Sequence, residues 1–539
     1  MRKIPLQRFI VYLTIVFIVV IAVLRCIRSV PHEKKEDSKT TAKVFNIVTF
    51  GAKGDKKSLD TEAIQQAIDA ANLHGKSIVL VPPGNFLTGT IWLKSNVELH
   101  LQEGATLFGS TELSDYDKNE CYALIHADGQ SRIAINGKGI IDGQGRQLAN
   151  NINQMVRNGL IEDPYWHNRP SEQNRPHLIN FMNCCKIDIS GFTLKNSACW
   201  VQSYRKCKEL MIENIAVEST AYWNNDGIDI VDCHDVKILN CQINSADDGI
   251  SLKSQDSSDC CDNIEIGNCT IRSSASAFKV GSASYGGFRN IVVNNLDIYD
   301  TYRSAIALEC VDGGILEQIE ITDLKARNTG NGIFLRLGHR NRDGKIGTLR
   351  NIHLNDITVE VPNNKPDTDY EMSGLPIREP HNLIPSSIVG LPGNCIQDVI
   401  LENVRIIFGG GAEKTRAFIS LDSLHTIDER PHDYPEFSMF GELPAWGFYI
   451  RHVAGLHLKK IRLQFEKSDF RPALVLDDVH QFTLDNLAIP MVTEEPPIVL
   501  HNVHHANLKN LNLPKNISEN IRIQGGSTFI KSSNGDMLN

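Results

Sequence analysis

Two short carboxylate motifs carry the clearest chemistry in this chain. Asp226 begins an Asp-Gly-Ile-Asp segment, and Asp247 and Asp248 begin an Asp-Asp-Gly segment one sequence repeat later. In a stacked-coil protein this spacing predicts that Asp226 and Asp247 lie one above the other on neighbouring coils, roughly 4.8 Å apart. Three carboxyl groups so close cannot all ionise easily, so the pKa of at least one should rise. A protonated acid beside ionised carboxylates is suited to cleaving a glycosidic bond.

The bulk composition is that of an ordinary globular protein with no sign of nucleic-acid binding. Of 539 residues, 41% are hydrophobic and 22% are charged. The net charge is −9, and the lysines and arginines are scattered rather than clustered, which argues against a nucleic-acid partner. This charge gives no global attraction for a polyanion, so any recognition of an acidic sugar must be local.

Residues 1–30 are typical of a signal or membrane-anchor segment. Basic residues flank an apolar run from Phe9 to Leu24. The run is long for a signal core and slightly short for a spanning helix, and no clear small-x-small cleavage site follows it. A cleaved signal and a retained anchor both stay open, and each predicts an exported protein that is periplasmic, membrane-anchored or extracellular. Only this segment would contact a membrane, and residues 31–43, rich in charge, serine and threonine, would form a tether.

The cysteines point to stacked free thiols rather than to disulfides. The chain has thirteen, and four of them recur just before Val- and Ile-rich strands: Cys184, Cys207, Cys233 and Cys261. Small apolar residues at one turn position of each coil would stack as an internal ladder, which favours buried thiols over bridges. No CxxC pair has a second ligand pair at zinc spacing, and we expect neither a metal nor another cofactor.

Short alternating strands recur from residue 44 to about residue 515. One unit pairs Lys186–Ile189 with Phe192–Leu194, and an Asn, Asp or Gly usually separates the two strands of a unit. Such repeats, with two or three short strands each, are typical of a solenoid, and no helical pattern alternates with them. The sequence therefore predicts an all-β protein, a parallel β-helix, with a C-terminal tail over residues 516–539.

Three departures from the repeat are expected. Asp60 can cap a short helix over Thr61–Ala71, whose apolar residues share one face and would close the N-terminal end of the stack. Two stretches rich in Pro, Gly and aromatic residues, Pro362–Asn394 and Gly409–Gly447, are expected to form loops rather than coils.

Taken as a set, the motifs resemble the polygalacturonase-type glycoside hydrolases of family 28. The segments that carry the resemblance, in the order of the family, are Phe50–Asp55, Val81–Gly84, Asn224–Asp229, Asp247–Asp248, Gly281–Ser282 and Gly286–Gly287. The family has threonine where this chain has Asn225, and the resemblance is good over residues 45 to 350 and weak beyond. It implies that the β-helix is right-handed and that hydrolysis inverts the anomeric carbon.

The resemblance also implies a role for each acid. Asp247 would protonate the leaving oxygen, while Asp226 and Asp248 would hold and deprotonate the attacking water. Inversion needs acid and base roughly 6.5–9.5 Å apart, so that water fits on the opposite face of the sugar. Neighbouring residues of an ideal strand point to opposite faces, so Asp247 and Asp248 can act together only if the backbone bends, which Gly249 permits. The alternative is a ladder of turn-capping aspartates, but capping needs one acid rather than three.

The chain departs from the family at two places that concern the substrate. Residues 274–282 contain no histidine where the family has Gly-His-Gly. The family's Arg-Ile-Lys subsite becomes Phe334–Arg340, which puts galacturonic acid at the cleavage point in question. Arg336 is still suited to a sugar carboxylate or to hydroxyls, because guanidinium offers two parallel donors. His339 is a candidate replacement for the missing imidazole, against the alternative of a structural loop histidine.

Further substrate contacts are expected from charged and aromatic side chains. Lys279 and Arg303 could line the groove, against the alternative of solvated charge. Trp223 is the strongest candidate for stacking on a sugar ring, and Trp166 is the next, while Asn224, beside Trp223, is a further candidate for substrate binding. The aromatic stretch from residue 434 to residue 449 would either wall one end of the groove, which favours attack near chain ends, or fill a core beneath a long loop.

The leading hypothesis is an exported, monomeric glycoside hydrolase that acts on polygalacturonan, rhamnogalacturonan or their oligosaccharides. A polysaccharide lyase is one alternative, in which the three acids would bind calcium. A non-catalytic carbohydrate-binding protein that keeps the scaffold is the other.

Overall fold

The computed structural model describes residues 42–342, 344–363, 381–416, 419–489, 495–513, 517–532 and 537–538. The chain divides into two units, Met1–Ala42 and Lys43–Asn539, and the second contains every element described below. The expected signal segment and nearly all of the tether lie outside the described residues. Within the described part of the chain, no helix is long and apolar enough to cross a membrane.

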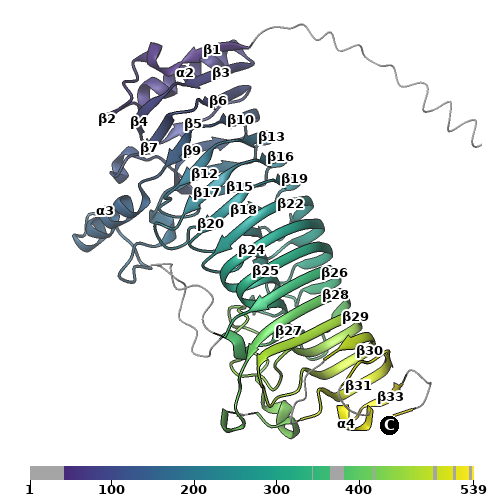
Figure 1. The fold of residues 1–539 in the computed structure, drawn as a ribbon. Coiled ribbons are helices and arrows are strands. Elements are labelled where there is room, and N and C mark those ends of the chain that lie inside the picture. The colour runs from purple at the N-terminus through teal and green to yellow at the C-terminus, as the bar shows by residue number, and fades with distance from the viewer. Residues whose placement is uncertain are drawn as a thin grey trace, which may run out of the picture. The chain divides into compact units, whose positions relative to one another are not determined.

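The second unit is a stack of coils in which strands pair in parallel with the coils before and after (Figure 1). The first ladder begins with β1 (Lys43–Asn46), β3 (Ser77–Val81), β6 (Val97–Leu101), β10 (Ser131–Gly137), β13 (Cys185–Ser190), β16 (Lys208–Glu213) and β19 (His234–Leu239). The second begins with β2 (Asp55–Leu59), β4 (Gly84–Thr88), β7 (Ala105–Gly109), β11 (Ile140–Asp142), β14 (Thr193–Lys195), β17 (Ala216–Ser219) and β20 (Gln242–Ser245). The third contains β5 (Ile91–Trp92), β9 (Cys121–Asp128), β12 (His177–Met182), β15 (Gln202–Arg205), β18 (Ile228–Val231), β21 (Ile250–Ser254), β23 (Phe278–Ser284) and β27 (Ser386–Val389).

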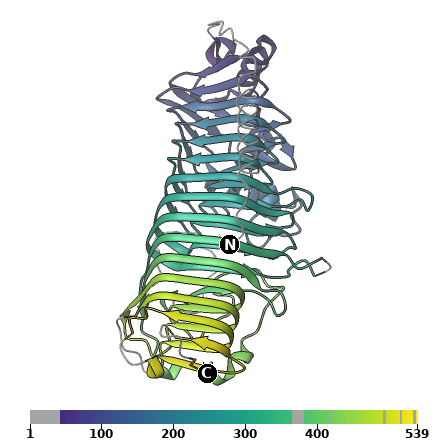
Figure 2. The same cartoon turned by 90° about the vertical axis from the view of Figure 1, so that its right-hand side faces the viewer.

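Later coils consist of long, bent strands that supply more than one ladder (Figure 2). They are β22 (Cys261–Ser273), β24 (Gly287–Cys310), β25 (Ile315–Leu337), β26 (Thr348–Val361), β28 (Ile396–Gly410), β29 (Phe448–Lys467), β30 (Leu474–Ala488) and β31 (Ile498–Lys509). The remaining strands are β8 (Lys118–Asn119), antiparallel to β9, and the C-terminal β32 (Ile521–Gln524) and β33 (Thr528–Lys531). The prediction of a parallel β-helix is confirmed.

Helices are few and lie outside the coils. They are α2 (Thr61–His74), α3 (Gly145–Arg157) and α4 (Ile517–Asn520), with short 3-10 turns η1 (Ile47–Phe50), η2 (Leu113–Asp115), η3 (Glu172–Asn174), η4 (His381–Leu383), η5 (Lys414–Arg416) and η6 (Leu421–Thr426). The expected helix after Asp60 is present as α2 and packs against β1 and β3 at the first coils. The expected helix cap by the Asp60 side chain is wrong. The Asp60 carboxylate instead accepts hydrogen bonds from the main-chain N–H groups of Lys53 and Gly54, at 2.8 and 3.2 Å.

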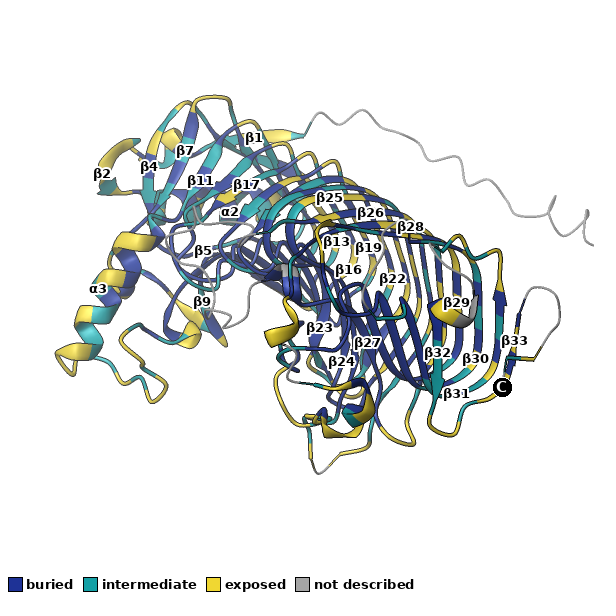
Figure 3. Cartoon of the chain, turned by 60° about the horizontal axis from the view of Figure 1, so that its bottom comes forward, coloured by how far each residue is buried: buried dark blue, intermediate teal, exposed yellow. Residues whose placement is uncertain are grey.

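The core runs through the middle of the coils and is built from alternating strand residues. In β18 and β21, for example, Ile228, Ile230, Ile250 and Leu252 are fully buried in it. Figure 3 shows buried residues along the strands and exposed ones on the turns and on α3. The twelve described cysteines are all free, as predicted, and Cys207 and Cys233 stack with a main-chain N–H to Sγ contact of 3.3 Å.

Two expected boundaries need correction. Residues 516–539 are not simply a tail, because β32 and β33 pair with β31 and continue the sheet. The stretch 362–394 is not all loop, because β27 pairs with β25 and β29 as part of a coil. Residues 364–380 within it lie outside the described residues. Between Gly410 and Phe448 the structure has turns and short 3-10 helices but no coil strand in the described part, as expected.

Candidate active site

The three acids lie in stacked turns that lead from the second ladder to the third. The N–H of Gly227 donates to the Asp248 carbonyl, and the N–H of Gly249 donates to the Ser276 carbonyl, both at 2.9 Å. Since Ile228 pairs with Ile250, Asp226 stacks on Asp248. The expectation that Asp226 stacks on Asp247 is therefore wrong by one residue, because one coil is one residue longer than the spacing of those two acids.

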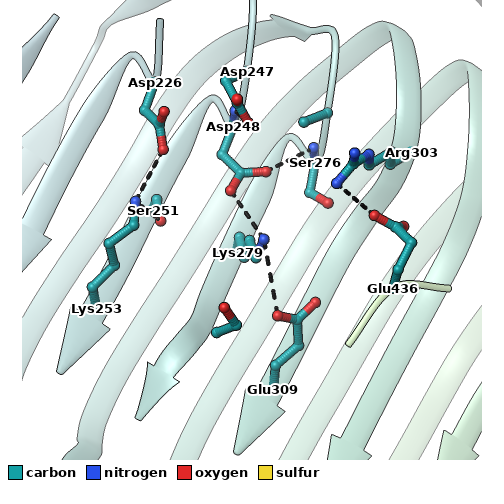
Figure 4. A network of polar contacts seen from close by, with 12 residues as sticks. Asp226, Asp247, Asp248, Ser251, Lys253, Ser276, Lys279, Arg303, Glu309 and Glu436 are labelled. Carbon is teal, nitrogen blue, oxygen red and sulfur yellow. Dashed lines mark hydrogen bonds and ion pairs between the residues drawn. The ribbon is translucent and has the colours of Figure 1, made fainter. Parts of the chain in front are cut away.

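The acids nevertheless converge as expected (Figure 4). One carboxyl oxygen from each of Asp226, Asp247 and Asp248 lies within 4.8 Å of the other two. Asp226 and Asp248 are buried, at 5% and 4% exposure, whereas Asp247 is partly exposed. Asp247 and Asp248 precede β21 rather than belonging to it, so strand alternation does not separate them. The Asp248 N–H donates to the Asp247 carboxylate at 3.0 Å, which holds this turn.

Lys253, on β21, is the cation that pairs with the acids of the first coil in the site. Its ammonium lies 3.0 Å from the Asp226 carboxylate and 2.9 Å from the Ser251 hydroxyl, and it also contacts the fully buried Asp229 carboxylate. The sequence reasoning missed Lys253 and Asp229. The sequence signal that could have found both residues is the alternation of side chains along β18 and β21. Isoleucine and leucine face the core there, and the residues between them face the other way.

Lys279 stands in the stretch that lacks the family histidine. Its buried ammonium is 3.1 Å from Asp248, donates to the Tyr434 hydroxyl at 3.0 Å and lies 3.9 Å from Glu309. The N–H of Ser276 adds a 3.0 Å hydrogen bond to Asp248. One coil further along, Arg303 pairs with Glu436 at 2.5 Å. The structure thus brings Lys279 and Arg303 to the acid cluster, together with Glu309 and Glu436, which sequence reasoning did not single out.

These surroundings separate the protonation states of the acids. Burial and the charges of Asp226 and Asp248 raise the pKa of Asp247 to about 8. Burial would also raise the pKa of Asp248, but Lys279, Lys253 and the Ser276 N–H together hold it below its ordinary value. Burial raises the pKa of Asp226 against the opposing charge of Lys253. At neutral pH the cluster therefore presents a proton donor, Asp247, beside an ionised acceptor, Asp248.

Asn224 and Trp223 lie beside the acids as expected. The Asn224 amide donates to the Asp247 carboxylate at 3.5 Å, and its oxygen accepts from Arg175 at 2.6 Å. The Trp223 ring is partly exposed, and the Arg169 guanidinium lies 4.6 Å from its centroid. Trp166 is in the segment before η3, where its indole N–H donates to Asn153 at 2.8 Å.

Arg336 and His339 are not brought to the acids. The Arg336 side chain is 1% exposed and donates to main-chain carbonyls of Gly390 and Glu429 at 3.0 and 2.5 Å. It thereby holds the segment between β28 and β29 against the coils rather than facing a groove. A ring nitrogen of His339 contacts the Gly344 carbonyl at 2.9 Å, which is the structural alternative for this residue.

The aromatic stretch before β29 is mainly core filler. Phe437, Phe440 and Tyr449 are buried in a second apolar cluster beneath the segment between β28 and β29, and Trp446 is buried in the main core. Tyr434 is the exception, since it is 52% exposed and its hydroxyl reaches Lys279. The stretch therefore contributes one tyrosine to the site rather than a wall of aromatic rings.

The carboxylate cluster has the spacing of a cation site, yet lysines already neutralise it. Lys253 and Lys279 lie 3.0 and 3.1 Å from Asp226 and Asp248, where a divalent ion would meet strong repulsion. We therefore expect that EDTA leaves the initial rate unchanged and that added calcium neither restores nor raises it. Initial rates on one substrate, with and without chelator, check this. A loss of activity that calcium alone restores would contradict it and would favour the lyase alternative.

Comparisons with known proteins show the family of this chain. The model of the glycosyl hydrolases family 28 matches residues 73–365, more than half of the chain. A probable polygalacturonase of Vitis vinifera is 24% identical over 409 residues, covering 68% of this chain and 75% of that protein. An exo-poly-alpha-D-galacturonosidase of Dickeya chrysanthemi is 30% identical over 259 residues, which cover 40% of this chain and only 42% of that protein.

Two solved structures share the fold. The hyperthermoactive exopolygalacturonase from Thermotoga maritima superposes with a TM-score of 0.55 at 22% identity, covering 68% of this chain and 87% of that one. The Yersinia enterocolitica family 28 exopolygalacturonase gives a TM-score of 0.56 at 19% identity, covering 88% and 79%. The acid cluster in its stacked turns, the parallel β-helix and the family match together show that this chain belongs to the family 28 glycoside hydrolases.

Proposed function

We propose that this protein hydrolyses pectic polysaccharide, polygalacturonan or rhamnogalacturonan, or oligosaccharides derived from it. The observation that carries the proposal is the convergence of Asp226, Asp247 and Asp248 in a family 28 chain, with the pKa of Asp247 raised to about 8 and that of Asp248 lowered. The similarity to a probable polygalacturonase and to an exo-poly-alpha-D-galacturonosidase supports this substrate class. We further propose export through residues 1–30 and action as a monomer, both from the sequence.

The mechanism assigns one proton transfer to each side of the cleaved bond. Asp247 gives its proton to the leaving glycosidic oxygen as the bond to the anomeric carbon breaks. Asp226 and Asp248 hold a water molecule, remove its proton and direct its oxygen to the anomeric carbon. Asn224, which donates to Asp247, orients the acid. Lys253 and Lys279 keep their partner carboxylates charged and in place.

The stereochemistry is proposed from family membership. The closest oxygens of the three acids lie within 4.8 Å, which is shorter than the roughly 6.5–9.5 Å expected between acid and base for inversion. The first distance is the nearest approach of single oxygens and the second is the separation of whole carboxyl groups, so the spacing expected for inversion stays a prediction. We still expect that the first product formed has the anomeric configuration opposite to that of the substrate bond. Proton NMR in the first minutes of hydrolysis measures this, and a first product with retained configuration would contradict inversion.

The raised pKa of Asp247 predicts how the rate depends on pH. As general acid it must be protonated, so kcat/KM should fall as pH rises through about 8, the pKa of this carboxyl. The lowered pKa of Asp248 keeps the acceptor ionised into the acidic range, so the acid limb should lie well below neutrality. A pH profile of kcat/KM checks both limbs. A rate that is flat from pH 6 to 10, with the fold intact throughout by circular dichroism, would contradict the role of Asp247.

A panel of pectic polysaccharides and oligosaccharides tests the function itself. We expect new reducing ends from at least one member and no ultraviolet absorbance from an unsaturated product. Absorbance of such a product would indicate the lyase. Binding without any release of sugar would indicate the non-catalytic protein.

A further inference from the structure

The cations on one side of the acids are already matched by the protein's own carboxylates. Lys279 has Asp248, Glu309 and the Tyr434 hydroxyl within 3.9 Å of its ammonium, one oxygen for each of its three donors. Arg303 is 2.5 Å from Glu436. Arg340, which lies near the Tyr434 ring, donates from its Nε to Asp312 at 2.9 Å.

Arg169 lies on the other side of the acids from Lys279 and Arg303, and unlike them it has no ion-pair partner among the described residues. Its guanidinium lies over the Trp223 ring, and no carboxylate of the described residues lies within ion-pair distance of it. It is partly buried, and burial and the charge of Arg175 lower its pKa, while the charges of Glu172 and then of Asp247 act in the opposite sense, so Arg169 lies in the electrostatic neighbourhood of the acids. A guanidinium stacked on an indole beside the general acid, with its donors unmatched, is suited to bind a carboxylate from the substrate.

Main-chain hydrogen bonds fix the order of these groups along the stack. Val201 donates to Asp226, Gly227 to Asp248, Gly249 to Ser276 and Ala277 to Ser304. The turn with Trp223 and Asp226 therefore comes first, the turn with Asp247 and Asp248 second, and the turn with Arg303 two coils later, an order that Figure 4 follows from Asp226 to Arg303. A sugar chain that lies along the stack across the acids would meet Arg169 on one side and the matched cations on the other.

We propose that the cleaved bond joins an acidic sugar to a neutral one, with the uronate held at Arg169 and Trp223 and the neutral sugar on the side of Lys279 and Arg303. The proposal rests on the proposed function and names the substrate within it: a chain in which galacturonate alternates with an uncharged sugar. A second uronate on the side of Lys279 would face Glu309 and Glu436 without a free cation, so its carboxylate would lose solvation without gaining a partner.

The test compares two oligosaccharides of equal length, one of galacturonate alone and one in which galacturonate alternates with rhamnose. We expect kcat/KM at least about tenfold higher for the alternating substrate. Equal or higher values for oligogalacturonate would overturn the inference while leaving the proposed function intact. If the protein cleaves neither oligosaccharide, both the inference and the proposed function are wrong.

Substitutions test which residues produce the expected preference for the alternating substrate. Arg169→Gln should lower kcat/KM at least about tenfold on the alternating substrate and by a much smaller factor on its carboxyl-reduced form. Arg132→Gln, at an exposed arginine on β10, is the matched control and should change neither rate. Glu436→Gln keeps the shape but leaves Arg303 unmatched, so it should raise the rate on oligogalacturonate relative to the alternating substrate. If Arg169→Gln slows both forms equally, or if Glu436→Gln leaves the ratio unchanged, the inference is wrong.

Discussion

Asp247→Asn should lower kcat/KM by roughly 10²–10⁴-fold while the fold keeps or gains stability. The amide has nearly the shape of the acid but carries no proton at a pKa suited to the leaving oxygen. The variant should still bind the substrate, because Trp223, Arg169 and the two other acids are untouched. Initial rates and calorimetric binding of an intact oligosaccharide measure both effects.

The stability part of this prediction follows from the sign of the pKa shift. The pKa of Asp247 is raised from 3.8 to about 8, so between these values the folded state binds a proton that the unfolded state has released. Stability is therefore lost as pH rises through this range, because the unfolded state gains free energy by ionising this carboxyl while the folded state keeps its proton. Asparagine removes that cost, so the melting temperature near pH 8 should not fall. Asp235→Asn, at an exposed residue of β19, is the matched control and should keep full activity. Unchanged sugar release by Asp247→Asn would refute the assignment of the general acid.

Lys253→Met should destabilise the fold by about 3–5 kcal/mol, the usual cost of leaving buried charge without its partner. Lys253 contacts both Asp226 and the fully buried Asp229, and methionine fills the same space without a charge. Urea unfolding at pH 7 measures the change in the free energy of unfolding.

A second substitution separates lost charge from lost packing. Asp229→Asn in the Lys253→Met background removes one stranded carboxylate and should recover part of the stability, whereas Asp229→Asn alone should not stabilise the protein to the same extent. If the double variant unfolds at the same urea concentration as Lys253→Met, the loss comes from packing rather than from the ion pair. An unchanged midpoint for Lys253→Met itself would contradict the prediction.

The parallel β-helix could be predicted because its signals are local. Alternating apolar residues, an Asn or Asp at each turn and the recurring cysteines all repeat within one coil. Many of those turn residues have positive φ, as at Asn214 and Asn240, a conformation that Asn and Asp tolerate better than other side chains. The predicted stacking of Asp226 is one residue out of register because the spacing of the motifs differs from the length of the coil, which is set by the core positions Ile228 and Ile250.

The partners of the site could not be predicted because they come from distant parts of the chain. Glu309, Glu436 and Tyr434 reach the acids only after several coils and a long loop have folded. Arg336 shows the opposite error, because the sequence predicted a site contact that the fold does not make. Its sequence neighbourhood suggested a sugar contact, but its guanidinium is occupied by carbonyls of a segment more than ninety positions away.

The hydroxyl of Tyr434 meets Lys279 across 155 positions of the chain. Synthesis runs from the N-terminus, and the early coils can fold while later ones are still being made. A nascent chain therefore assembles its three acids well before the segment arrives that offsets Arg303 and completes the surroundings of Lys279. On the ribosome, the acids that we propose to break the bond would therefore be in place before the segment that we propose to discriminate between sugars.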